Sequence, residues 1–319
     1  MSGWKWARPA IAVGVLTLAV FLLQRTFRSY DASEIMASVR SISALRFAAI
    51  AACAFASYLC LTGFDALGVR YAGGCIAYRR IARVSMTSLS LGHSIGFAAL
   101  SSGAIRYRLY SRLGLGLEQV AKVVLLCAVT VALGLSAILS TGFLMRPEIA
   151  ERIGGLGPRE VLGLGILAGA VPLTYLLLAV TVKGRLKVRQ WTFRMPPPGI
   201  ALAQVLIGPL NFACVAACLY AALSDRTTID YLDVLAAYAL ANTASLLAHV
   251  PGGLGVIESV VAFLLPGADV VGALIVFRVV YYLIPFVLGA ASFALSELAR
   301  RSTSGVQERG SAVLARFRR

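Results

Sequence analysis

Long apolar runs are the feature that most constrains the fold of this 319-residue chain. Several of them exceed the roughly 18 residues that a helix needs to cross a bilayer core. Hydrophobic residues make up 59% of the sequence and charged residues only 14%, whereas soluble domains average about 25% charged residues. The runs are continuous, while strands of an outer-membrane barrel alternate apolar and polar residues. The sequence therefore predicts an all-α polytopic membrane protein.

Six apolar segments are predicted to span the membrane completely. They cover residues 9–24, 46–69, 120–145, 160–182, 200–222 and 270–296. The first has the basic start and apolar core of a signal peptide, but no cleavage site of small residues follows it, so we expect it to remain as a span. Segments 84–105 and 233–265 are also apolar, but Ser, Thr, Gly and Pro interrupt them.

Basic loops indicate the orientation, because short cytoplasmic loops carry an excess of Lys and Arg. Segment 183–194 contains basic residues and no acid, and the tail 298–319 is also basic. We therefore expect both in the cytoplasm, together with the N-terminus. Segment 223–233 is acidic and segment 146–160 is balanced, so these two should lie outside.

The same rule predicts that segments 84–105 and 233–265 are re-entrant hairpins. Basic loops flank 84–105 on both sides, so it should enter and leave from the cytoplasm, whereas 233–265 should dip in from outside. Residues 1–297 then form one transmembrane domain, made of an inverted repeat of about 9–145 and 160–296. Many secondary transporters have this architecture.

The two histidines of the chain fall at corresponding places in these hairpins, His93 in LGHSIG and His249 in LAHVPG. Pro251, Gly252 and Gly253 should break the helix at the tip of the second hairpin. Broken backbone at membrane depth is tolerated where protein buries it or water lines it, so we expect the two tips to build a shared polar cavity. The histidines are candidate proton carriers, or donors to phosphate, and the alternative is a structural helix end.

Arg106, Tyr107, Arg108 and Tyr110 follow the first hairpin directly. Guanidinium groups match the geometry of phosphate, so this motif is a candidate for headgroup recognition. The alternative is a cytoplasmic anchor with interfacial aromatic residues.

Arg278 lies deep in the last span, where an arginine is costly unless it is paired or hydrated. We predict that it pairs with Glu258, on the outgoing arm of the second hairpin, and the alternative is that this pair is only structural. Tyr281 and Tyr282 border its helix face, and Pro285 should bend the helix.

Other polar residues in spans are expected to be structural. A local ion pair with Arg70 is expected for Asp65. Gln204, Asn211 and Asn242 are expected to hydrogen-bond between helices.

The net charge is +16, and its basic residues cluster in loops and in the tail, where we expect them to contact anionic lipid headgroups. Nucleic acid is therefore not an expected partner. The six cysteines form no CxxC motif and no cluster with histidine, so we expect no metal site. No nucleotide-binding loop is present, no cofactor is expected, and catalytic residues are not predicted.

Three stretches, SSGAIRYRLYSRLGL (101–115), HVPGGLGVIESV (249–260) and FRVVYYLIPFVLG (277–289), resemble the transmembrane domain of the lysylphosphatidylglycerol synthase/flippase family. The resemblance covers about residues 40–297. It implies an inner-membrane protein that carries a lipid between leaflets. Its motifs fall on Arg106, Tyr107, Arg108, Tyr110, His249, Pro251, Gly252, Gly253, Gly255, Glu258, Arg278, Tyr281 and Tyr282.

Bifunctional members of that family add a soluble domain that transfers an amino acid to phosphatidylglycerol. Only the short tail follows the last span here, so we expect no such domain and no lysyl transfer by this chain alone. The leading hypothesis is a flippase or transporter for a lipid with a polar, phosphate-bearing headgroup. The alternatives are a non-transporting partner that presents lipid to a separate biosynthetic enzyme, and an intramembrane hydrolase or transferase. A homodimer is left open.

Overall fold

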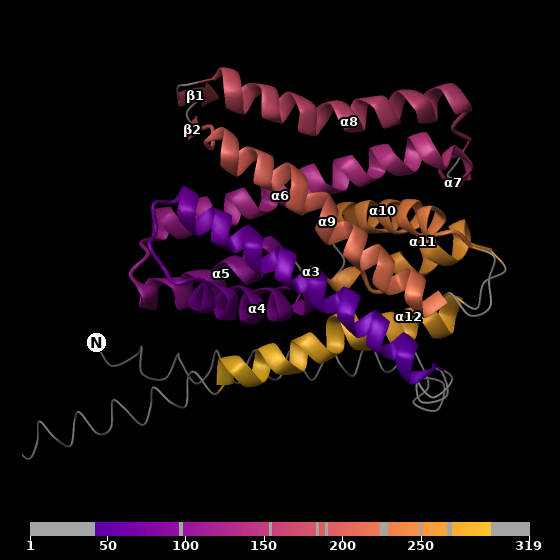
Figure 1. Ribbon diagram of the computed structural model, residues 1–319, viewed down its shortest axis with the longest axis horizontal. Coiled ribbons are helices and arrows are strands. Elements are labelled where there is room, and N and C mark those ends of the chain that lie inside the picture. Colours follow the sequence, from indigo (N-terminus) through magenta and orange to yellow (C-terminus); the bar gives the residue numbers. More distant parts are fainter. Residues whose placement is uncertain are drawn as a thin grey trace, which may run out of the picture.

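The computed structural model describes residues 42–95, 98–152, 155–182, 185–188, 191–223, 229–248, 251–266 and 270–294. Helices make up most of this part of the chain (Figure 1). The predicted first span, 9–24, and the basic tail lie outside the described residues.

The elements are α3 (Ala44–Tyr71), α4 (Tyr78–Ile95), α5 (Ala98–Tyr110), η1 (Ser111–Leu113), α6 (Leu117–Met145), α7 (Pro147–Glu151), α8 (Pro158–Thr181), β1 (Arg185–Val188), β2 (Trp191–Arg194), α9 (Pro198–Leu223), α10 (Tyr231–Ala248), η2 (Pro251–Gly253), α11 (Val256–Leu264), α12 (Val270–Arg278) and a π-helical turn, η3 (Val279–Leu283). Helical residues 284–294 follow η3.

Helix boundaries follow local sequence signals. The Ser43 hydroxyl caps α3 by accepting a hydrogen bond from the backbone N–H of Arg46 at 3.4 Å. Helices α7 and α8 begin at Pro147 and Pro158, where the missing N–H of proline costs no helical hydrogen bond. Gly114, with φ of 91°, ends the helical segment after α5 because glycine adopts this left-handed conformation readily.

Six helices in the described residues are long and apolar enough to cross a membrane. Five of them, α3, α6, α8, α9 and 272–294, are spans predicted from the sequence. The sixth is α10, which was expected to be an arm of the second hairpin. The all-α polytopic class is therefore confirmed, and the added feature is the short antiparallel pair β1–β2.

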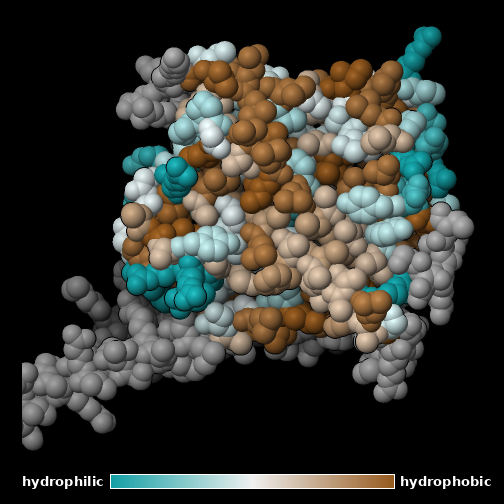
Figure 2. Space-filling view, in the orientation of Figure 1, coloured by the Kyte–Doolittle hydropathy of each residue, from teal (hydrophilic) through white to brown (hydrophobic). Residues whose placement is uncertain are grey.

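The surface shows the two-ended character of a membrane protein. In Figure 2, hydrophilic residues gather towards the two sides of the view, and hydrophobic residues cover most of the surface between them. Helices α6 and α8 run across this apolar region in Figure 1. In Figure 1, β1 and β2 lie on one side and α7 lies on the other. Arg146, directly before α7, pairs with Asp233 of α10 at 3.2 Å. In this view, the helices therefore connect two polar sides through an apolar region.

The core is built on α3 and α9, which pack antiparallel along their length. Arg46 donates to the carbonyl of Ala221 at 3.1 Å, and Ser57 donates to Asn211 at 2.7 Å. Further along, a Cβ on Gly63 would lie 2.5 Å from the side chain of Ile207. Small residues thus allow close contact between helices, as is common in membranes.

Two hairpins pack into this core. The first is formed by α4 and α5, which pack against each other, and the second by α10 and α11. Helix α4 also packs against η2, the tip of the second hairpin. The first hairpin therefore contacts the tip of the second. The expected meeting of the two tips and the re-entrant character of both hairpins stay predictions.

Candidate functional site

Arg278 ends α12 and is buried, with 5% of its surface exposed. Its Nε donates to Oε1 of Glu258 at 2.5 Å, and Nη2 donates to Oε2 at 3.0 Å. Nη1 donates to the carbonyl of Gly252, and Nη2 donates to that of Gly253 at 2.9 Å. The pairing of Glu258 with Arg278 is therefore confirmed. The guanidinium group joins α12 to both the tip and the outgoing arm of the second hairpin.

Glycines give the tip of this hairpin its shape. Gly252, Gly253 and Gly255 have φ angles of 59°, 62° and 80°, which residues with a Cβ rarely adopt. A Cβ on Gly253 would also lie 2.4 Å from the hydroxyl of Ser245. The N–H of Gly255 donates to Oε2 of Glu258 at 2.9 Å. Arg278 and Glu258 thus satisfy backbone groups that a broken helix leaves unpaired in a membrane.

Tyr282 and Tyr281 both lie beside this site, as predicted. The guanidinium carbon of Arg278 is 4.7 Å from the ring centroid of Tyr282, which is a favourable cation–π distance. The ring of Tyr281 stacks on Phe277 with centroids 5.5 Å apart. Its hydroxyl lies 2.9 Å from that of Ser57 in α3. The tyrosines therefore connect the Arg278 site to the central helices.

A π-helical turn, η3, directly precedes Ile284 and Pro285 in the last membrane helix. The bend expected at Pro285 stays a prediction. Proline has no N–H, so the carbonyl of Tyr281, four residues earlier, lacks its usual helical partner. The hydroxyl of Tyr58 donates to this carbonyl at 3.3 Å. The N–H of Ile284 bonds to Val279, five residues back. Such turns are frequent at functional sites.

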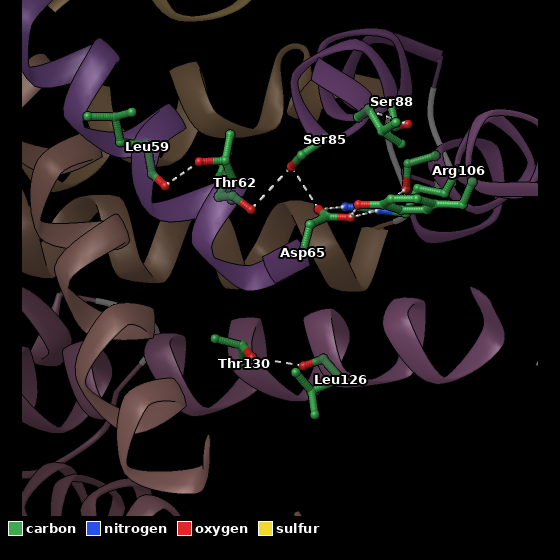
Figure 3. A network of polar contacts seen from close by, with 12 residues as sticks. Leu59, Thr62, Asp65, Ser85, Ser88, Arg106, Leu126 and Thr130 are labelled. Carbon is green, nitrogen blue, oxygen red and sulfur yellow. Dashed lines mark hydrogen bonds and ion pairs between the residues drawn. The ribbon is translucent and has the colours of Figure 1, made fainter. Parts of the chain in front are cut away.

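A second buried ion pair joins the first hairpin to α3 (Figure 3). Arg106 of α5 donates to Asp65 through Nε at 2.9 Å and Nη2 at 2.8 Å, and both side chains are almost fully buried. Ser85 and Tyr110 also donate to this carboxylate, at 2.7 and 3.0 Å. Nη1 of Arg106 donates to Ser102 at 2.9 Å. The carboxylate of Asp65 thus holds α4 and α5 against α3.

The local pairing of Asp65 with Arg70 was expected, and this expectation is wrong. Asp65 pairs with Arg106, which lies 41 residues away in sequence. Sequence reasoning did not place Asp65 in the site, although it is an acidic residue inside an apolar segment. That signal could have found it, because such residues are costly in a membrane and need a partner.

The side chains of the motif 106–110 lie on different faces of α5 and have different partners. Arg106 and Tyr110, one helical turn apart, both bind Asp65. Tyr107 is 44% exposed. The guanidinium carbon of Arg108 lies 5.5 Å from the ring centroid of Phe293. One face of α5 therefore serves the buried ion pair, while the other faces outward.

The roles predicted for the two histidines fall on side chains outside the described residues. His93 belongs to α4, but its side chain lies outside the described residues, as does all of His249. Pro251 begins η2, so its expected place at the tip is observed. Within the described residues, no group of three or more His, Cys, Asp or Glu could hold a metal ion.

Polar residues within the spans mostly bond between helices, as expected. Gln204 of α9 donates to Thr130 of α6 at 2.7 Å and accepts from Tyr175 of α8 at 2.6 Å. Asn211 accepts from Ser57. For Asn242, the bond found among the described residues lies within its own helix, where its amide donates to Tyr238 at 3.1 Å, so its expected bond between helices stays a prediction.

Comparison with known proteins identifies the family. Residues 8–289 match the family model of the lysylphosphatidylglycerol synthase TM region. The chain belongs to this family. It is 30% identical to the protein slr0712 of Synechocystis sp., over 98% of this chain and 99% of that protein. It is 28% identical to the inner membrane protein YbhN of Escherichia coli, over 92% of this chain and 93% of YbhN.

The match to the lysylphosphatidylglycerol synthase TM region includes both buried ion pairs and both hairpins. With the six apolar helices, membership makes the chain a multi-pass membrane protein related to lipid handling. The resemblance inferred from the three sequence motifs is therefore confirmed.

Proposed function

We propose that this protein binds a lipid through a phosphate-bearing headgroup and moves it between the leaflets of the inner membrane. The buried guanidinium group of Arg278 at the broken tip of the second hairpin is the observation that carries this proposal. An arginine inside a membrane marks a functional site by default, and its planar fork matches the oxygens of a phosphate.

The two arginines are held by carboxylates in the described structure, and this fits a site that exchanges partners. Glu258 forms an ion pair with Arg278, and Asp65 forms an ion pair with Arg106. A phosphate that replaces either carboxylate would keep the guanidinium paired. The hairpin would at the same time lose one of the contacts that hold it. Binding of a headgroup and movement of a hairpin would then be linked.

The inverted repeat belongs to this proposal, and reciprocal packing supports it. A Cβ on Gly142, in the last span of the first half, would meet Ala236 of the second hairpin at 3.0 Å. A Cβ on Gly289, in the last span of the second half, would meet Ser90 of the first hairpin at 2.7 Å. Each hairpin thus packs on the last span of the other half. The antiparallel packing of α3, from the first half, against α9, from the second half, joins the two halves directly.

Reconstitution in liposomes tests the function. Labelled anionic, aminoacylated and polyprenyl lipids would be placed in one leaflet, and their appearance in the other would be measured with and without protein. We expect protein-dependent exchange of at least one class, lost in Arg278→Lys, which keeps the charge but not the fork. Arg79→Lys, at an exposed site, is the matched control. Absence of protein-dependent exchange for every class would refute transport.

A second candidate is a membrane partner that presents lipid to a separate enzyme. The guanidinium groups of Arg106 and Arg278 both donate several hydrogen bonds within the protein. This favours the second candidate, because ion pairs bonded in this way also suit a rigid scaffold. Under this alternative, Arg278 variants fold and bind lipid, and lose association with the enzyme rather than leaflet exchange. Cytoplasmic termini are part of both proposals and follow from the basic loops.

A further inference from the structure

The strands β1 and β2 form a two-sided hairpin that we infer to be a docking element for the anionic leaflet of the membrane. The strands pair antiparallel, with Arg185 opposite Arg194, Leu186 opposite Phe193, Lys187 opposite Thr192 and Val188 opposite Trp191. Directly opposed residues share a face, and successive residues alternate between faces. The register therefore sorts the eight strand residues into two sets.

One face carries only apolar residues, which are Leu186, Val188, Trp191 and Phe193. A two-stranded hairpin is at best marginally stable in water and needs a partner to cover such a face. Among the described elements, the strands pack extensively only against each other. Tryptophan and phenylalanine favour the boundary between headgroups and acyl chains. This face fits that boundary.

The other face carries Arg185, Lys187 and Arg194, with Thr192 as its fourth residue. Like charges placed directly opposite destabilise a strand pair, and Arg185 stands opposite Arg194 in the register. This face contains no acidic residue that would offset the repulsion. Anionic headgroups would offset it, and each Lys or Arg near such a surface contributes about 1 kcal/mol.

The position of the hairpin in the chain holds it at the membrane surface. It connects the end of α8 at Thr181 to the start of α9 at Pro198, both of which are helices that can cross a membrane. Figure 1 shows it at the end of these two helices. Pro196 and Pro197 stand between the hairpin and α9, and consecutive prolines form short, stiff spacers of about 3 Å per residue. The hairpin therefore stays within the headgroup layer, where both of its faces find a suitable environment.

Full-length protein with Trp4→Phe and Trp6→Phe keeps Trp191 as its single tryptophan, and nanodiscs provide the membrane. We expect Trp191 emission to be quenched by lipids brominated on their acyl chains. We also expect phosphatidylglycerol to be enriched around the protein over phosphatidylcholine, as measured by mass spectrometry of the retained lipids.

The variant R185Q/K187Q/R194Q removes the three charges and relieves the repulsion, so it does not disfavour the hairpin. We expect it to lose about tenfold or more of the phosphatidylglycerol enrichment. The control R79Q/R80Q/R83Q removes three exposed charges from another predicted cytoplasmic segment and should lose much less. Equal losses in both variants would overturn the inference. So would a Trp191 that is shielded from water but not quenched by brominated lipid, which would indicate cover by protein.

Discussion

Arg278 donates to both carboxylate oxygens of Glu258 across a separation of 20 residues. The pair also binds the backbone of the hairpin tip, through the carbonyl of Gly253 and the N–H of Gly255. One ion pair therefore determines where the second hairpin meets the last membrane helix.

Glu258→Gln should destabilise the protein by about 3–5 kcal/mol, because removal of one partner leaves the other charge buried and unpaired. Arg278→Glu should do the same, and the double exchange E258R/R278E should recover part of the loss. Thermal unfolding in detergent and lipid exchange in liposomes would measure the two effects. If the double exchange restores neither stability nor exchange, the pair does not act as a unit.

Tyr110→Phe should lower the free energy of unfolding by about 1.5–3 kcal/mol, because it removes a hydrogen bond to a buried carboxylate. The hydroxyl of Tyr110 lies 3.0 Å from Oδ1 of Asp65. Tyr107→Phe is the matched control, since it removes the same atom from the exposed side of the same helix. Chemical unfolding would compare them, and equal effects would contradict the inward role of Tyr110.

The two ion pairs show which side-chain partners could be predicted from the sequence and which could not. The partner of Arg278 was predictable, because an arginine inside a span requires an acid and Glu258 lies in the adjacent hairpin. The partner of Asp65 was not, because Arg70 is close in sequence and equally basic. Only the packing of α5 against α3 decides between Arg70 and Arg106, and that packing depends on how a whole hairpin docks.

Gly253→Ala should destabilise the tip of the second hairpin by about 1–3 kcal/mol, because its φ of 62° is unfavourable for alanine and its Cβ would collide with Ser245. Gly163→Ala is the control, since a Cβ there meets nothing within 4 Å and alanine favours a helix. Hydrogen exchange at the tip would report the difference. Equal protection in both variants would count against the glycine requirement.

The sequence predicted the long helices within a few residues, because their apolar runs must match the thickness of the membrane. It did not predict β1 and β2, because the charges of 183–194 dominate the pattern and conceal the alternation of Leu186, Val188, Trp191 and Phe193. The expected shared cavity stays a prediction, since the sequence cannot say how closely two hairpins approach.

Gly208→Ala should separate α9 from α6 and destabilise the protein by about 1–3 kcal/mol, the usual range for overpacking. A Cβ on Gly208 would lie 2.7 Å from the carbonyl oxygen of Thr130 and 3.0 Å from Gly134. Backbone atoms cannot turn away as side chains do, so the helices themselves must shift. This shift would also stretch the bond between Gln204 and Thr130.

Gly199→Ala, on the same helix with nothing within 4 Å of its Cβ, is the control. Thermal unfolding should separate the two variants by several degrees, and a Gly208 variant as stable as the control would show that the crossing tolerates expansion.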